Sequence, residues 1–159
     1  MTAIQTGCSI IEATLGHLLP GKFDSVIARV MLASAGMQES DFVYHQQIGG
    51  PARSFWGFEQ GGGIHGVLTN AATSQYAKAV CMLRAVAPTE SDVYAAFLKD
   101  DLLACAFARL LMFADPAPLP PLGDIQAGWK CYERCWRPGK PRRDDWTGNY
   151  IAAQAAVVP

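Results

Sequence analysis

Apolar residues recur at helical spacing in the first forty residues of the chain. The segment over residues 7–19 places five aliphatic side chains on one helical face: Ile10, Ile11, Leu15, Leu18 and Leu19. The sequence LPGK then ends that segment, because proline and glycine interrupt helices. A second helix is expected to begin at Asp24 or Ser25, either of which can act as an N-cap, and to fade near residues 36–39.

Helical patterns return after residue 72. Residues 101–114 are apolar nearly all round, which is typical of a buried central helix. Four prolines make residues 115–124 an extended connector. Further helices are expected over 73–86, over 88–100 with Thr89 as N-cap, over 101–114, from Asp124 to Cys135, and from Asp144 to Ala156. No alternating pattern demands a large sheet, so the expected class is mainly α with about six to seven helices.

Residues 40–72 follow neither pattern. This stretch is rich in glycine, contains Pro51 and has few helix-forming residues, so a long irregular region is expected, with one short helical turn or a small hairpin. Its aromatic residues argue against disorder: Phe42, Tyr44, Phe55, Trp56 and Phe58. Flat aromatic faces pack well against sugar rings, and glycines let a ligand approach the backbone closely. The alternative is a core-anchored loop, which uses the same residue types.

Composition narrows the classes of protein that remain. The 159 residues fit a single domain, and 50% hydrophobic with 17% charged residues exclude a disordered chain. A net charge of −1 gives no general affinity for nucleic acid. No apolar run of about 18 residues is present, so no membrane span is expected. The N-terminus lacks the charged start of a secretory signal, which favours synthesis in a cytoplasm.

Five cysteines do not form a disulfide pattern. Their number is odd and their spacing is irregular, so free, buried thiols are expected. Cys131 and Cys135 stand one helical turn apart and could share a metal ion. Because no histidine or third cysteine is near them in the sequence, the prediction is that the protein has no metal site and no cofactor.

Glu39 is the strongest candidate for acid–base chemistry. It lies at the expected C-terminal end of a helix, where the negative end of the helix dipole and partial burial both raise the pKa of a carboxyl group. A general acid that cleaves a glycosidic bond needs such a raised pKa, because it must still hold a proton near neutral pH. The alternative is an exposed glutamate at a frayed helix end.

Four motifs, in order, resemble the soluble lytic transglycosylase and goose-type lysozyme superfamily, and most closely a group of phage-encoded proteins within it. They are "QESDF" (38–42), "GPARSFWGFEQGG" (50–62), the helix "DDLLACAFARLL" (100–111) and the stretch from Trp129 to Pro141 that contains "WRPGKP". In that superfamily a helix ends in Glu-Ser, and a loop of the form Ala-x-Gly-Leu-x-Gln closes the cleft. The resemblance covers about residues 30–150.

The resemblance implies a single lysozyme-like domain over residues 1–159 that cleaves the glycan strand of peptidoglycan. Glu39 would be the single catalytic residue, giving a 1,6-anhydro product, and Ser40 would hydrogen-bond near the acid or the sugar. The expected substrate-binding residues are Ser40, Phe55, Trp56, Gly57, Phe58 and Tyr150, the last as a late tyrosine lining the cleft. The resemblance also implies a phage virion protein, made in the host cytoplasm and acting at the host cell wall or periplasm, with other virion proteins as further partners.

Glu59 and two departures from the family pattern leave alternatives open. Hydrolysis would need a second carboxylate, for which Glu59 is the candidate, although it could instead accept backbone N–H bonds in the glycine-rich turn. Ser54 stands where the pattern usually has glycine, and Gly57 where it usually has a sugar-binding glutamine. These changes favour the alternative of a virion structural or internal protein with a lysozyme-like fold and weak or no catalysis.

The remaining polar and aromatic residues are expected to have structural roles. Arg109 lies in the apolar helix and is expected to pair with an acid, namely Glu39, Asp100 or Glu59. Packing and solvent contact without a binding role are expected for the others: His45, His65, Trp129, Trp136 and the basic turn 137–143.

Overall fold

The computed structural model describes residues 1–159 as eight α-helices without strands. Their bounds are α1 (Ala3–His17), α2 (Val26–Ser40), α3 (His65–Thr69), α4 (Ser74–Leu83), α5 (Glu90–Ala96), α6 (Asp101–Ala114), α7 (Ile125–Trp136) and α8 (Arg143–Val157). The prediction of a mainly α protein is confirmed. Helix α3 has five residues and is the short helical turn that was one of the two alternatives for the irregular stretch 40–72; it directly follows a π turn, Gln60–Ile64.

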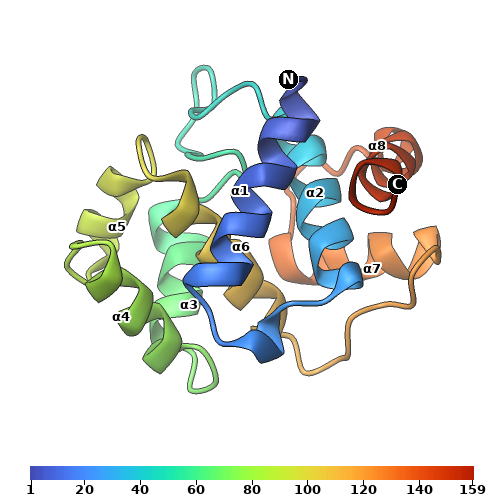
Figure 1. The fold of residues 1–159 in the computed structure, drawn as a ribbon. Helices are drawn as coiled ribbons and strands as arrows, with labels where there is room; N and C mark the ends of the chain where they lie inside the picture. The colour runs from blue at the N-terminus through green and yellow to red at the C-terminus, as the bar shows by residue number, and fades with distance from the viewer.

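Helix α6 forms the centre of the fold (Figure 1), with α3, α4 and α5 on one side and α7 and α8 on the other. Every residue from Leu103 to Leu110 is buried, so the prediction of a central helix is confirmed. Helix α2 packs mainly against α8, and α1 packs on both α6 and α2. None of the eight helices combines the length and the apolar character that crossing a membrane requires.

Helix ends follow local capping chemistry. Thr89 and Asp124 accept the backbone N–H bonds expected of N-caps, from Asp92 and Ala127 respectively. Helix α1 begins four residues earlier than its apolar pattern indicates, because the side chain of Thr2 caps its first turn. Helix α2 ends at Ser40, and its C-cap Asp41 takes a left-handed conformation with φ of 53° that turns the chain into the following loop.

Phe42 anchors the loop 41–59 to the helices. Its buried ring fits between Gly7 of α1 and Gly36 of α2, where an added Cβ would lie 2.6 Å and 2.1 Å from ring carbons. Trp56 is fully buried as well, and its indole N–H donates to the carbonyl of Leu32 over 2.9 Å. The two glycines thus make the space that lets an irregular loop attach firmly to the core.

The expectation that Arg109 forms a buried ion pair is wrong. The residue is 6% exposed and its Nε donates to the carbonyl oxygen of Phe23 over 2.8 Å, but no acid lies within ion-pair distance. Asp100 pairs with Arg84 instead, at 2.8 Å. Burial lowers the pKa of Arg109, and nearby thiols and Asp24 oppose that effect.

Candidate active site

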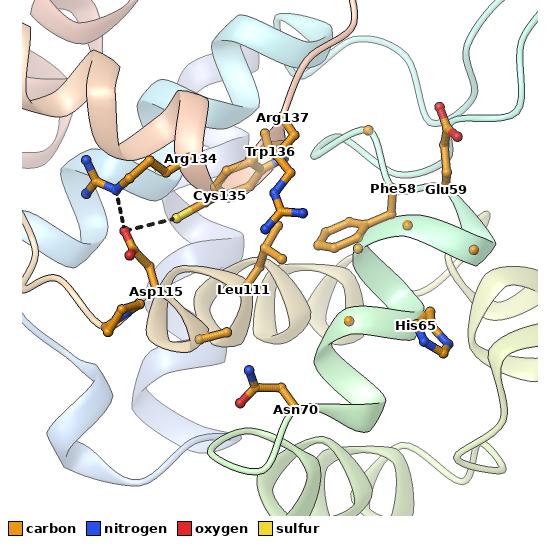
Figure 2. A pocket seen from close by; sticks show the side chains of 17 residues that line it. Phe58, Glu59, His65, Asn70, Leu111, Asp115, Arg134, Cys135, Trp136 and Arg137 are labelled. Atoms are coloured by element: carbon orange, nitrogen blue, oxygen red, sulfur yellow. Dashed lines mark hydrogen bonds and ion pairs between the residues drawn. The ribbon is translucent and has the colours of Figure 1, made fainter.

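Two cavities lie side by side along one face of the molecule. The first has a volume of about 730 Å³ and is bounded by the end of α2, the loop 41–59 and the chain from Tyr132 to Arg142. The second, of about 850 Å³, lies between the glycine-rich turn 60–66, the end of α6 and the end of α7 (Figure 2). Four residues line both cavities: Gly57, Glu59, Trp136 and Arg137.

Glu39 faces the first cavity from the last turn of α2, as its place in the sequence predicts. Its carboxyl group is largely removed from water, and the hydroxyl of Tyr132 donates a hydrogen bond to it. Burial raises the pKa of Glu39, while the Tyr132 bond and the positive charge of Arg142 partly oppose that rise. The prediction of a raised pKa is therefore confirmed in direction, and burial is its main cause.

The turn that carries Glu39 is fastened to α8. Gln38 donates from its side-chain amide to the carbonyl of Arg142 over 2.9 Å and accepts from Asn149 over 2.9 Å. The guanidinium of Arg142 in turn donates to the backbone carbonyl of Gln38. These bonds join residues about a hundred positions apart, so they fix where the acid sits relative to the C-terminal wall of the cavity.

Ser40 lies on the first cavity, but its hydroxyl is engaged with the backbone. It donates to the carbonyl of Phe55 over 2.8 Å and accepts from the N–H of Phe42 over 3.2 Å. The side chain is only 9% exposed. In this arrangement Ser40 ties the loop to the end of α2 beside the acid.

Gly57 lies directly against the carboxyl group of Glu39, the candidate catalytic acid. Its φ is +64°, and a Cβ built on it would lie 2.4 Å from Oε2 of Glu39. No side chain, including the glutamine of the family pattern, fits there unless Glu39 moves. Ser54, three residues earlier, has φ of 68°, a conformation that suits glycine better than serine. Backbone held in this sparsely populated region beside a cavity is frequent at functional sites.

Two of the aromatic residues expected to bind sugar do not reach either cavity. Phe55 is 4% exposed and Trp56 is 0% exposed, and both pack against Phe42. The prediction that their faces receive sugar rings is wrong, because the loop uses these rings as anchors. Phe58 is also buried against Phe97, yet it forms part of the second cavity's wall.

The cavity's own aromatic residues come from other parts of the chain. Trp136 at the end of α7 is half-buried, lines both cavities, and stacks on Tyr132 with ring centroids 5.7 Å apart. Tyr44 contributes an exposed ring to the first cavity. The sequence interpretation placed Trp136 in the core, although its position directly before "RPGKP" in a recognised motif was a signal that it belongs to the site.

Tyr150 is not a cleft residue, so that prediction is wrong. It is 1% exposed, packs beside Trp146 and accepts a bond from the N–H of Gly123 over 2.9 Å. The tyrosine that reaches the acid is Tyr132, one helix earlier. A tyrosine one turn before Trp136 on a helix has the spacing to share its face, which is the signal that sequence reasoning missed.

Glu59 is exposed and lines both cavities. Its side chain caps no backbone N–H in the following turn, so the predicted structural role in that turn is wrong. The two loop histidines have acidic partners: His45 lies 2.9 Å from Asp101, and His65 contacts Glu90. Three carboxylates line the first cavity, Glu39, Asp41 and Glu59; Asp41 and Glu59 are exposed, and Glu39 is the one that is partly buried.

The chain matches no protein-family model, no curated protein and no solved structure. Its function therefore rests on the geometry of this site and on the motifs in its own sequence.

Proposed function

We propose that the protein is a peptidoglycan-cleaving lytic transglycosylase with a lysozyme-like fold, carried by a phage particle, with Glu39 as general acid and base. The observation that carries the proposal is a carboxyl group at a helix end, with its pKa raised by burial, facing a cavity of about 730 Å³. The order of the four sequence motifs supports the choice of substrate. The enzyme would act at the host cell wall.

In this mechanism protonated Glu39 gives its proton to the oxygen that links N-acetylmuramic acid to N-acetylglucosamine. As the bond from that oxygen to C1 breaks, the C6 hydroxyl oxygen of the muramic sugar attacks C1, and the Glu39 carboxylate takes the hydroxyl proton. The products are a 1,6-anhydro end and a free 4-hydroxyl, with Glu39 protonated again. Tyr132 donates to Glu39 and Gly57 borders it, so both would hold the acid in position.

The neighbouring cavities fit a substrate that is a chain of sugars. A glycan strand would pass across Trp136, whose partly exposed ring offers an apolar face between the two cavities. Arg137 and Lys140 line the first cavity and suit the carboxylates of peptides attached to the strand. Glu59 is the second carboxylate that hydrolysis would require, with water in place of the C6 hydroxyl.

The second candidate function is a virion structural or internal protein that keeps the fold with little catalysis. The observation that favours it is Gly57, which provides no side-chain amide for the sugar. One lost hydrogen bond to substrate is worth about 0.5–1.5 kcal/mol, which weakens binding without removing the acid.

Digestion of purified peptidoglycan tests the proposal, with muropeptide masses as the readout. Wild-type protein should release anhydro ends, and Glu39→Gln should release them about 1,000-fold more slowly while keeping its circular dichroism spectrum and melting temperature near or above those of the wild type. Reducing ends instead of anhydro ends would identify hydrolysis and make Glu59 part of the mechanism. Folded wild-type protein without any product would overturn the enzymatic proposal in favour of the structural one.

A further inference from the structure

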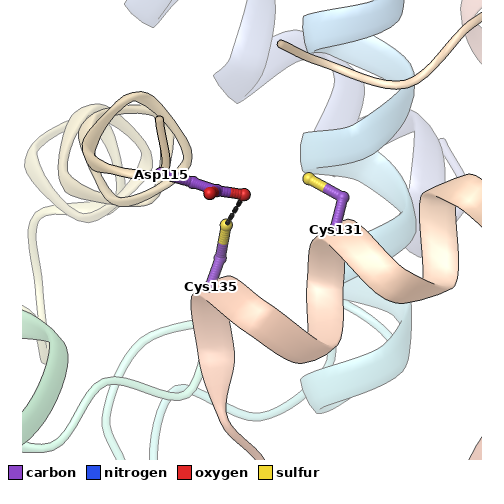
Figure 3. Close-up of side chains that lie close together, drawn as sticks. All are labelled: Asp115, Cys131 and Cys135. Atoms are coloured by element: carbon purple, nitrogen blue, oxygen red, sulfur yellow. Dashed lines mark hydrogen bonds between the residues drawn. The ribbon is translucent and has the colours of Figure 1, made fainter. Parts of the chain in front are cut away.

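Two thiols and a carboxylate converge at the junction of α6 and α7. Cys131 and Cys135 lie one turn apart on the same face of α7, and Asp115 is the residue that ends α6 (Figure 3). The two sulfur atoms and a carboxylate oxygen all lie within 4.8 Å of one another, and the Sγ of Cys135 is 3.9 Å from Oδ2 of Asp115. Asp115 is separated from the two cysteines only by the proline-rich connector and the start of α7.

These spacings are close to those of a tetrahedral zinc site. With Zn–S of about 2.3 Å and Zn–O of about 2.0–2.2 Å, neighbouring ligand atoms are about 3.5–3.8 Å apart. Side-chain rotations that bring the three atoms together by up to about 1 Å would reach that geometry. Asp115 and Cys135 also line the second cavity, which provides an entry path and room for a water molecule as fourth ligand.

The positive charges of Arg109 and Arg134 act on the cluster. Arg109 is buried without an ion-pair partner, and the groups whose charges act on it are Cys131, Cys135 and Asp24. Asp24 is already engaged by Arg29, with two bonds of 2.8 Å. The guanidinium of Arg109 therefore has no counter-ion within ion-pair distance.

We propose that Asp115, Cys131 and Cys135 bind one Zn²⁺ ion, with the fourth coordination position open to the second cavity. Two thiolates, one carboxylate and Zn²⁺ carry a net charge of −1, and Arg109 and Arg134 supply positive charge beside it. Arg134, whose Nε lies 2.9 Å from Asp115, would hold that ligand from outside the coordination shell. Binding releases the two thiol protons to solvent.

The ion would link the C-terminal end of α6 to α7. Tyr132 lies on α7 between the two cysteine ligands in sequence and donates a hydrogen bond to Glu39. The site does not depend on the proposed glycosidase activity, because none of its ligands touches the acid. Metal binding by the Glu39→Gln variant should therefore equal that of the wild type, so the two proposals can fail separately.

Cobalt titration of the full-length, reduced, metal-free protein tests the site. One equivalent of Co²⁺ should give a thiolate-to-cobalt charge-transfer band and tetrahedral d–d bands with release of the thiol protons, and Zn²⁺ should then displace the cobalt and remove these bands. Cys135→Ser and Asp115→Asn should each weaken binding by at least about 100-fold, since even outer-shell changes cost about 10–100-fold. Cys8→Ser, in α1, is the matched control and should bind like the wild type.

Thermal stability gives a second readout on the same samples. At a free Zn²⁺ concentration about 100 times Kd, the melting temperature should rise by about 5–10 °C in the wild type and in Cys8→Ser, and not in Cys135→Ser. Folded wild-type protein without a charge-transfer band would overturn the proposal. So would equal affinity in Cys135→Ser, since the metal would then lie elsewhere.

Discussion

Glu39 and Glu59 face the same cavity, but the parts of the protein that present them differ in construction. Glu39 stands on the last turn of a helix, accepts a bond from Tyr132 and is closely bordered by Gly57. Glu59 stands at the start of a turn with three consecutive glycines, Gly61–Gly63, and caps no backbone N–H there. The carboxyl group of Glu39 is held in place and partly buried, whereas Glu59 is exposed to solvent.

The difference matters because a general acid needs both a raised pKa and a fixed position. Removal from water disfavours the charged form of Glu39, which keeps its proton available to a leaving group. Fixed placement contributes to rate as well, since a displacement of about 1 Å can cost about 100-fold. Glu59 is exposed and makes no cap hydrogen bond, so the comparison favours Glu39 as the acid of the proposed mechanism.

The largest expected effect comes from exchanging each carboxylate for its amide. Glu39→Gln should lower kcat/KM for peptidoglycan by about 1,000-fold, within the range that a general acid contributes. Glu59→Gln should lower it by less than about tenfold. Comparable losses in both variants, measured as initial rates of muropeptide release, would show that both carboxylates take part and that the mechanism is hydrolytic.

The next effect tests the close approach of the loop to the acid. Gly57→Ala should lower kcat/KM by about 100-fold, because a methyl group 2.4 Å from Oε2 of Glu39 forces the carboxyl group aside. The same change at Gly61, where a Cβ has open space, is the control on the Glu59 side and should change the rate only a few-fold. Wild-type activity in Gly57→Ala, with the fold intact, would mean that the contact does not position the acid.

Most of the helices could be predicted from the sequence. Only part of the candidate site could be predicted in the same way. The all-round apolar pattern of 101–114 predicted the central helix because burial on every side leaves no polar face. Glu39 was identified from the sequence because the helix dipole disfavours a carboxylate at the C-terminal end of a helix. Trp56 was misassigned, since an aromatic residue in a glycine-rich loop can point either inward or outward. Tyr132 was missed because its bond to Glu39 spans 93 positions of sequence.

A stability measurement tests how the loop 41–59 is anchored to the helices. Gly36→Ala should destabilise the protein by about 1–3 kcal/mol, because its methyl group would lie 2.1 Å from the ring of Phe42. Gly16→Ala, also in a helix but with open space around the new Cβ, should be neutral or stabilising by up to about 1 kcal/mol. Urea unfolding measures the stability of both variants. Equal denaturation midpoints would show that the ring of Phe42 does not depend on the absence of a side chain at Gly36.

The smallest expected effect is the pH dependence of stability. Between the ordinary glutamate pKa of 4.5 and the raised value in the fold, folded protein keeps a proton on Glu39 that the unfolded chain has released. The free energy of unfolding therefore falls as pH rises through that window, and the loss is complete above the folded pKa. Glu39→Gln removes this titration while its amide oxygen can still accept the Tyr132 bond.

We therefore expect Glu39→Gln to be more stable than the wild type at pH 7, by on the order of 0.5–1 kcal/mol, and equal to it at pH 4. Glu59→Gln is the control because it removes the other glutamate that lines the first cavity, and a gain at pH 7 of the same size in that variant would contradict the assignment of the effect to Glu39. Denaturant unfolding at the two pH values measures the effect. If Glu59→Gln, and not Glu39→Gln, were stabilised at pH 7, the comparison would be reversed. The carboxyl group that is unfavourable when charged would then be the one in the glycine-rich turn.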